Sequence, residues 1–206
     1  FGDCSVGAET QRDQRGLIQT PQELWERKVY PELQPVSDAL YRFREAHGLP
    51  RHPRNIRYSP SGRLDHKDYP PLSDPLFSTP GVEVIAVTTT EGAEQLKAAG
   101  AEAKCVKLIV EPTLDRDGLI RAHERLFSEY GMRYLDCEGG ETILLALREA
   151  GILDEVFLTV TDIEIGVAGR EGVKQMFDLN GAELVAEGTI GPPSAWVLRR
   201  WRFNRR

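Results

Sequence analysis

The sequence contains 206 residues, of which 40% are hydrophobic and 28% are charged, and its formal net charge at pH 7 is −6. A chain of this size and composition can bury a full core without disulfides or metals. The acidic balance argues against a broad nucleic-acid-binding surface, and no apolar run is long enough to cross a bilayer. No signal peptide opens the chain. We therefore expect a cytoplasmic protein with neither a nucleic acid nor a membrane as its partner.

The cysteines and histidines indicate neither a disulfide framework nor a metal site. Cys4, Cys105 and Cys137 are widely spaced and include no CxxC pair. This pattern is typical of reduced thiols in a cytoplasm. We expect no zinc site, because no metal-ligand spacing relates the four histidines, which are His47, His52, His66 and His123.

The first fifty residues predict one strand and two helices. Phe1–Val6 reads as a strand already in progress, and Gly7 ends it. Because the sequence begins without a methionine, we expect the true N-terminus to be missing. Pro21–Tyr30 is expected to start as a short helix, with proline at a favourable first position. Val36–His47 is expected to form the second helix, which Gly48 ends.

Residues 55–63 predict a short strand followed by a polar turn. Ser59, Ser61 and Arg63 lie in this segment, and their hydroxyl and guanidinium groups are good phosphate donors. The alternative is a turn rich in serine, proline and glycine that binds no ligand. Three nearby arginines are expected to lie on a solvated rim of the protein, and they are Arg51, Arg54 and Arg57.

A strong strand is predicted at Val82–Val87, and threonines follow it. Thr88 and Thr89 lie where a parallel sheet binds ligands, at the carboxyl end of a strand. They can also cap the next helix, Glu91–Ala99, which Gly100 closes. The two roles are compatible.

The next elements continue the alternation of strand and helix. Cys105–Val110 is predicted to be a strand, Asp117 can cap the helix after it, and Gly131 ends that helix. From Val82 onward the order argues for a largely parallel sheet covered by helices. One apolar helix face is expected from Leu119, Ala122, Leu126, Phe127 and Tyr130.

The stretch that follows predicts a strand, a double-glycine turn, a helix and a second strand, together a βαβ unit. The strand is Tyr134–Glu138, and the turn is formed by Gly139 and Gly140. The helix is Glu141–Ala150, and the second strand is Val156–Thr161. The free amide N–H groups at such a helix start attract phosphate. A plain tight turn is the alternative.

The amino-acid sequence of this stretch resembles that of the pyrimidine reductase family of riboflavin biosynthesis. The resemblance is carried by Glu-Gly-Gly at 138–140, by Leu-Asp-Glu at 153–155 and by Ile165-Gly166. We interpret Asp154 and Glu155 as structural residues that brace the start of their strand. The family's Val-Gly-Ala-x-Thr segment, which contacts its cofactor, is matched by Val6, Gly7, Ala8 and Thr10.

This resemblance implies a fold, which is α/β and dihydrofolate-reductase-like. The fold has three layers and a mostly parallel central sheet, finished by an antiparallel hairpin of Glu183–Ile190 and Trp196–Phe203. It implies a single reductase domain over residues 1–206 that lacks its N-terminal strand and helix, since nothing matches the family's Ser-x-Asp-Gly segment. It also implies a homodimer. A solvated or edge face is expected of the last strand's arginines, including Arg199, Arg200 and Arg202.

The resemblance also implies an activity, the NADPH-dependent reduction of a phosphorylated pyrimidine riboside to its ribityl form. Glu138 is the candidate catalytic residue, which could bind or protonate the substrate, or could be only a local charge partner of the helix start. NADH in place of NADPH stays open. The alternatives are a reductase of another heterocycle or carbonyl and a non-catalytic nucleotide-binding relative. The candidate cofactor-binding residues are Val6, Gly7, Ala8, Thr10, Ser59, Ser61, Arg63, Thr88, Thr89, Gly139, Gly140, Glu141 and Thr142.

Overall fold

The structure is a computed structural model that describes residues 3–7, 34–64, 70, 72–73, 75–104, 106–160, 178–190 and 196–204. The chain divides into two compact units, Phe1–Ile143 and Leu144–Arg206. Each unit is described by itself, and the single domain predicted over residues 1–206 stays a prediction. The predicted helix at Pro21–Tyr30 lies outside the described residues, as do Ala8, Thr10 and Cys105.

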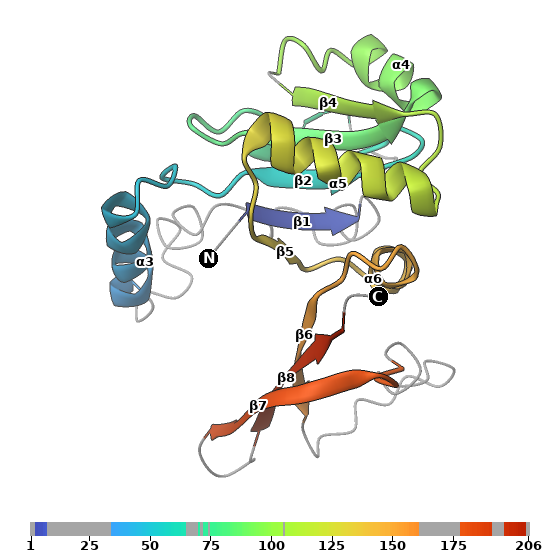
Figure 1. The fold of residues 1–206 in the computed structure, drawn as a ribbon. Coiled ribbons are helices and arrows are strands. Elements are labelled where there is room, and N and C mark those ends of the chain that lie inside the picture. The colour runs from blue at the N-terminus through green and yellow to red at the C-terminus, as the bar shows by residue number, and fades with distance from the viewer. Residues whose placement is uncertain are drawn as a thin grey trace. The chain divides into compact units, whose positions relative to one another are not determined.

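The first unit is built on a parallel sheet of five strands (Figure 1). The strands are β1 (Asp3–Gly7), β2 (Asn55–Tyr58), β3 (Val84–Thr89), β4 (Val106–Glu111) and β5 (Leu135–Cys137). Their order across the sheet is β4-β3-β2-β1-β5, and every neighbouring pair is parallel. The predicted parallel sheet is therefore confirmed for these strands.

Four α-helices and one short 3₁₀ helix are found in the described parts of the chain. They are α3 (Gln34–Ala46), α4 (Thr90–Ala98), α5 (Arg116–Tyr130), α6 (Glu141–Glu149) and η2 (Pro75–Phe77). The predicted helices at residues 36–47, 91–99 and 141–150 are confirmed to within a few residues. None of the described helices is long and apolar enough to cross a bilayer.

The helix caps follow the sequence signals with one exception. Gly131 ends α5 in the left-handed conformation, with φ 64°, as a residue without a side chain can. The predicted N-cap Asp117 is wrong, because α5 begins two residues earlier and Asp115 accepts the Gly118 N–H at 2.9 Å. Asp117 instead lies in the first turn of α5, where a carboxylate interacts favourably with the helix dipole.

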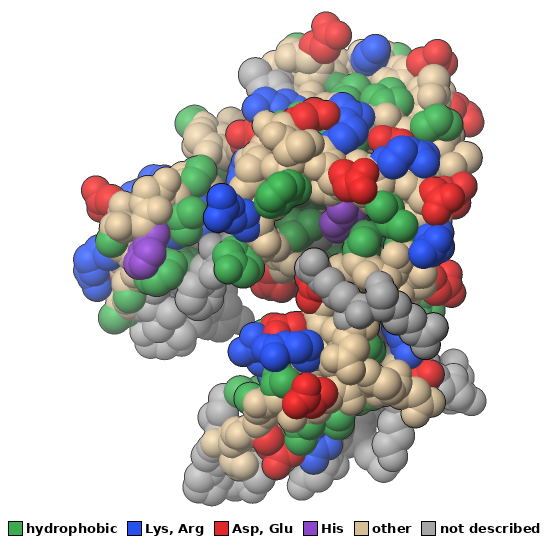
Figure 2. Space-filling model, viewed as in Figure 1, with side chains coloured by type: hydrophobic (Ala, Val, Ile, Leu, Met, Phe, Trp, Pro, Cys, Tyr) green, Lys and Arg blue, Asp and Glu red, His purple; other side chains and the backbone are tan. Residues whose placement is uncertain are grey.

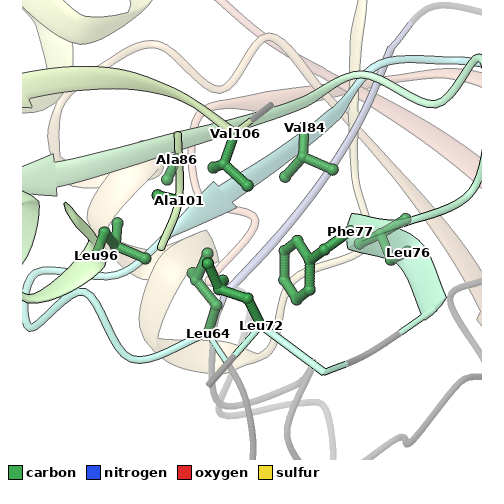
Figure 3. Close-up of a cluster of buried hydrophobic side chains, with 9 residues drawn as sticks. All are labelled: Leu64, Leu72, Leu76, Phe77, Val84, Ala86, Leu96, Ala101 and Val106. Carbon is green, nitrogen blue, oxygen red and sulfur yellow. The ribbon is translucent and has the colours of Figure 1, made fainter. Parts of the chain in front are cut away.

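The two faces of the parallel sheet are covered by different helices. Val84 and Ala86 point to one face and pack with Leu96 of α4, because alternate residues of a strand point to opposite sides. Figure 3 shows this cluster, which also contains Leu64, Leu72, Leu76, Phe77, Ala101 and Val106. The other face carries Tyr58, which meets His123 of α5. This arrangement gives the three layers that the family resemblance implies.

The buried face of α5 is narrower than its sequence pattern predicts. Leu119, Ala122 and Leu126 are buried, whereas Phe127 is 59% exposed. Residues three or four apart lie on one side of a helix, and Phe127 follows Leu126 by only one position. The placement of Phe127 on the apolar face is therefore wrong.

The second unit holds an antiparallel sheet of three strands. They are β6 (Glu155–Val160), β7 (Ala182–Ile190) and β8 (Trp196–Phe203), in the order β6-β8-β7. The predicted hairpin of β7 and β8 is confirmed. The prediction that β5, α6 and β6 form one parallel βαβ unit is wrong, because β6 pairs antiparallel with β8 from Glu155 to Val160.

The arginines of β8 lie on a central strand and not on an edge strand, which corrects the expected edge face. Arg199 pairs with Glu187 at 2.8 Å, and Arg200 and Arg202 both pair with Glu155. Glu155 thus bridges β6 to β8, and the Asp154 carbonyl accepts the Phe203 N–H at 2.8 Å. The structural role predicted for Glu155 is confirmed by its side chain, whereas Asp154 contributes through its backbone carbonyl.

The largely buried pair of Tyr58 and His123 makes the stability sensitive to acid. The Tyr58 hydroxyl lies 2.8 Å from His123 Nε2, and burial lowers the pKa of His123 from 6.5 to about 4. A histidine that stays neutral in the folded state but binds a proton in the unfolded state destabilises the fold as the pH falls. This loss begins near pH 6.5 and ends near pH 4.

We expect His123→Gln to remove this part of the acid sensitivity. The free-energy difference between wild type and variant should change by about 1.4 kcal/mol per pH unit between pH 6.5 and 4. Urea unfolding at several pH values measures it, with His47→Gln at an exposed position as the control. A difference that does not vary with pH would contradict the assignment.

Candidate functional site

The strand order marks one point on the carboxyl edge of the parallel sheet. The chain passes from β1 outward through β2, β3 and β4, and then returns to place β5 on the other side of β1. Ligands of open α/β sheets bind outside the carboxyl ends of the strands at such a reversal. The expected position of a ligand is therefore the edge where β1 and β5 end.

The predicted site residues of the described chain follow the carboxyl ends of these strands. Ser5 pairs with Cys137 and Gly7 pairs with Tyr58, so β1, β2 and β5 end near one another. Val6 and Gly7 end β1, while residues 138–142 come directly after β5. Residues 59–63 come after β2, and Thr88 and Thr89 end β3.

Gly139 is required by the packing of the protein itself. A Cβ atom placed there would lie 2.0 Å from Ile143 Cγ2 and 3.3 Å from Cys137 Sγ. The absence of a side chain thus lets α6 begin close to the end of β5. Gly140 and Thr142 are exposed at the start of this helix, whereas the Glu141 side chain lies outside the described residues. Of the glycine pair, Gly140 is the exposed one.

The turn after β2 uses its hydroxyl groups for internal bonds. Ser59 is buried, and its Oγ donates to the Arg63 carbonyl at 3.0 Å. The Ser59 carbonyl in turn accepts the Thr88 hydroxyl at 2.7 Å. A hydroxyl has one proton to donate, so these two groups cannot also donate to a phosphate without breaking a bond in the protein.

The same turn closes the start of α4. Thr89 accepts the Gly92 N–H as the N-cap, and its hydroxyl donates to the Pro60 carbonyl at 2.7 Å. The capping role expected of Thr89 is thereby confirmed. A Cβ at Gly62 would lie 2.1 Å from the Gly92 carbonyl oxygen, so the turn and the helix meet backbone to backbone. Ser61 and Arg63 stay exposed on the outside of the turn.

Glu138 lies at the carboxyl end of β5, between the strand and the glycine pair. Partial burial raises the pKa of its carboxyl, and the negative charge of Asp136 raises it further. The positive charge of Arg57 acts in the opposite direction. The pKa of Glu138 therefore lies above that of an ordinary glutamate, which suits a group that delivers a proton.

Arg57 and Arg54 do not form the solvated rim predicted for them. Arg57 is 0% exposed on the second strand of the sheet and donates to the Asn55 Oδ1 at 3.3 Å. Arg54 pairs with the buried Asp3 at 2.7 Å. Only Arg51 is exposed, and its guanidinium lies over the Tyr41 ring. The sequence signal for a buried Arg57 was its place inside a short strand, between Ile56 and Tyr58.

The remaining charged side chains of the described residues show how ionisable groups are distributed outside the candidate site. No group of three or more His, Cys, Asp or Glu in these residues is arranged to hold a metal ion. Lysines and arginines are interspersed with acidic side chains over the face drawn in Figure 2. On that face the charged side chains are distributed as on an ordinary solvated surface.

Comparison with solved structures identifies the fold. The chain is similar to a pyrimidine reductase-like protein from Corynebacterium diphtheriae, with a TM-score of 0.65 and 20% identity over 100% of this chain and 77% of that one. This likeness confirms the predicted fold class, an α/β fold with a mostly parallel sheet and a C-terminal antiparallel hairpin. At this identity it establishes the fold alone.

Two structures of RibD from Acinetobacter baumannii also match. Form 2 has a TM-score of 0.48 and 14% identity over 98% of this chain, and form 1 has a TM-score of 0.41 and 16% identity over 73%. The chain spans 46% and 37% of the length of those two RibD chains. Compared by sequence, the chain matches no family model and no curated protein.

We expect Gly139→Ala to destabilise the first unit because the new methyl group would collide with Ile143. The expected loss is about 1–3 kcal/mol, the usual cost of overpacking. Urea unfolding measures it. Gly188→Ala is the matched control, since a Cβ at Gly188 meets nothing within 4 Å. Equal stability of the two variants would show that α6 does not depend on the missing side chain.

Proposed function

We propose that this chain is an NADPH-dependent reductase that acts on a small phosphorylated pyrimidine riboside. The observation that carries the proposal is the place of Glu138-Gly139-Gly140 directly after β5, beside β1, at the reversal of strand order. The fold shared with a pyrimidine reductase-like protein supports the same reaction class. The sequence resemblance supplies the substrate class.

The residues present fit a dinucleotide at this edge. Gly140 and Thr142 are exposed at the start of α6, where backbone N–H groups and the helix dipole favour a pyrophosphate. Gly7 ends β1 and would leave room for the nicotinamide end of the cofactor. The other candidate cofactor-binding residues of the same segment are Val6, Ala8 and Thr10. Ser61 and Arg63 are the exposed donors that would meet the phosphate of the adenosine half.

Glu138 would provide the proton in the reduction. When bound, NADPH would supply the hydride to the carbon of the substrate's C=N or C=O double bond. The electron pair of that bond moves to the nitrogen or oxygen, which takes the proton from the Glu138 carboxyl. A pKa raised above that of an ordinary glutamate makes the protonated form of Glu138 more abundant at any given pH.

A non-catalytic relative, which binds a nucleotide or only a protein partner, is the second candidate, and the turn after β2 favours it. Ser59 was expected to bind phosphate, and Thr88 and Thr89 were candidate cofactor-binding residues, yet their hydroxyls already donate to carbonyl groups of the protein. With fewer hydroxyls available as hydrogen-bond donors, the chain would bind a cofactor less tightly. Turnover of NADPH with a pyrimidine riboside separates the two candidates. A homodimer and a cytoplasmic location also stay predictions, and sedimentation tests the first of them.

Gly140→Asp is expected to abolish NADPH binding. A carboxylate at the start of α6 would occupy the place of the pyrophosphate and repel its charge. Calorimetric titration of wild type and variant with NADPH, and separately with NADH, measures the loss and the preference between the two cofactors. Gly188→Asp, on an exposed strand of the second unit, is the matched control. Unchanged affinity in Gly140→Asp would remove the pyrophosphate from this helix start.

Glu138→Gln should slow turnover without weakening cofactor binding. The amide keeps the shape of the side chain but cannot release a proton, and a general acid contributes roughly 10²–10⁴-fold to a rate. Steady-state NADPH oxidation gives kcat, and calorimetry gives the cofactor affinity. Glu94→Gln on the exposed side of α4 serves as the control. If kcat is unchanged in Glu138→Gln, the proton comes from another group.

A further inference from the structure

Three charged residues share one face of the parallel sheet at the proposed site. Asp136 and Glu138 are alternate residues along β5 and its end, so they point to the same side. Arg57 of β2 pairs with Val6 of β1, and the register of β1 with β5 ends at Ser5 and Cys137, one residue before Val6 and Glu138. Arg57 and Glu138 thus occupy one row across three strands.

The Arg57 row lies on the face opposite α5. Tyr58 points toward His123 of α5, so the preceding residue of β2 points away from that helix. Asn55 lies on the same face as Arg57 and, through Cys4, is level with Asp136. Two successive rows on this face therefore carry polar side chains from β2 and from β5.

A guanidinium without exposed surface is costly unless negative or polar groups surround it. Removing a charge from water costs several kcal/mol, which nearby opposite charges and hydrogen bonds must offset. Arg57 is 0% exposed, while Asp136 and Glu138 lie on the exposed end of the same face. Two strand spacings, roughly 10 Å, separate the backbones of Arg57 and Glu138, a span over which two long side chains interact.

The two charges act on Glu138 in opposite directions. Asp136 raises the pKa of the Glu138 carboxyl through like-charge repulsion, whereas Arg57 lowers it through attraction. Among the described residues these are the charged groups that face Glu138. Neither residue is part of the resemblance in the sequence, which covers only Glu138 and the two glycines of this stretch.

We propose that Asp136 and Arg57 are positioning residues, whose opposite charges act on the Glu138 carboxyl from the same face of the sheet and set how readily it delivers its proton. Asp136 keeps the proton on the acid before the reaction, and Arg57 stabilises the carboxylate that is left after the proton has moved. This inference rests on the proposed function of Glu138 as the proton donor. A general acid must give up its proton and regain it within one cycle.

The test is the titration of Glu138 in three variants. Protein labelled with ¹³C at the glutamate side-chain carboxyl is followed by NMR from pH 3 to 9 without cofactor or substrate, and Glu138→Gln identifies the Glu138 signal. Asp136→Asn is expected to move the titration midpoint to lower pH, and Arg57→Gln to higher pH. Glu94→Gln, which removes one distant negative charge, should leave the midpoint in place.

A merely structural role would not give shifts of opposite sign. Because Arg57 is buried, its variant could fail to fold, and in that case Asp136→Asn, at an exposed position, decides alone. Arg57→Lys keeps the positive charge and should restore the wild-type midpoint in a folded protein. An unchanged midpoint in Asp136→Asn, or the same direction of shift in both variants, would overturn the inference.

A second readout separates this inference from the proposed function. The basic limit of NADPH oxidation, where the Glu138 carboxyl loses its proton, should move in the same directions as the NMR midpoints. If the NMR midpoints shift as expected while no pyrimidine riboside is reduced at any pH, the positioning role stands and the proposed reaction fails. If reduction occurs but both variants have the same pH profile as the wild type, Asp136 and Arg57 do not act on the proton donor.

Discussion

The structure of the first unit depends on the parallel pairing of β1 with two strands that are far apart in sequence. β1 holds β2 through residues 4–7 and β5 through residues 3–5. Parallel neighbours cannot be joined by a tight turn, so helices and long connections must separate them. The same pairing places the ends of β1, β2 and β5 together. The fold and the candidate site are thus consequences of one constraint.

Close backbone packing then determines which groups face outward at that edge. Gly139 brings α6 onto the end of β5, and the contact of Gly62 with Gly92 brings the 59–63 turn onto the start of α4. At the second contact, the hydroxyls of Thr88 and Thr89 donate to carbonyl groups of the turn. They are therefore not available to bind a phosphate. The start of α6 keeps exposed groups, which is why the proposed cofactor site lies there and not at α4.

Much of the fold could be predicted from local sequence signals. Gly131 and Gly48 ended their helices as expected, since both adopt a positive φ that glycine adopts without strain. The strands of the parallel sheet were recognisable as short apolar runs, and the hairpin of β7 and β8 by its two strands and their close spacing. The failures have a common cause. The pairing of β6 with β8, the burial of Arg57 and the exposure of Phe127 depend on which surfaces meet in space.

The sequence by itself determined the elements, their order and the Glu-Gly-Gly turn, because propensity, capping and turn chemistry act over a few neighbouring residues. It also determined the α/β class, through the alternation of strands and helices. Only the tertiary structure decided that β1 lies between β2 and β5, and that Arg57 and Asp136 flank Glu138 on one face. Those relations join residues about 50 to 130 positions apart, and they follow from strand register, which no local signal specifies.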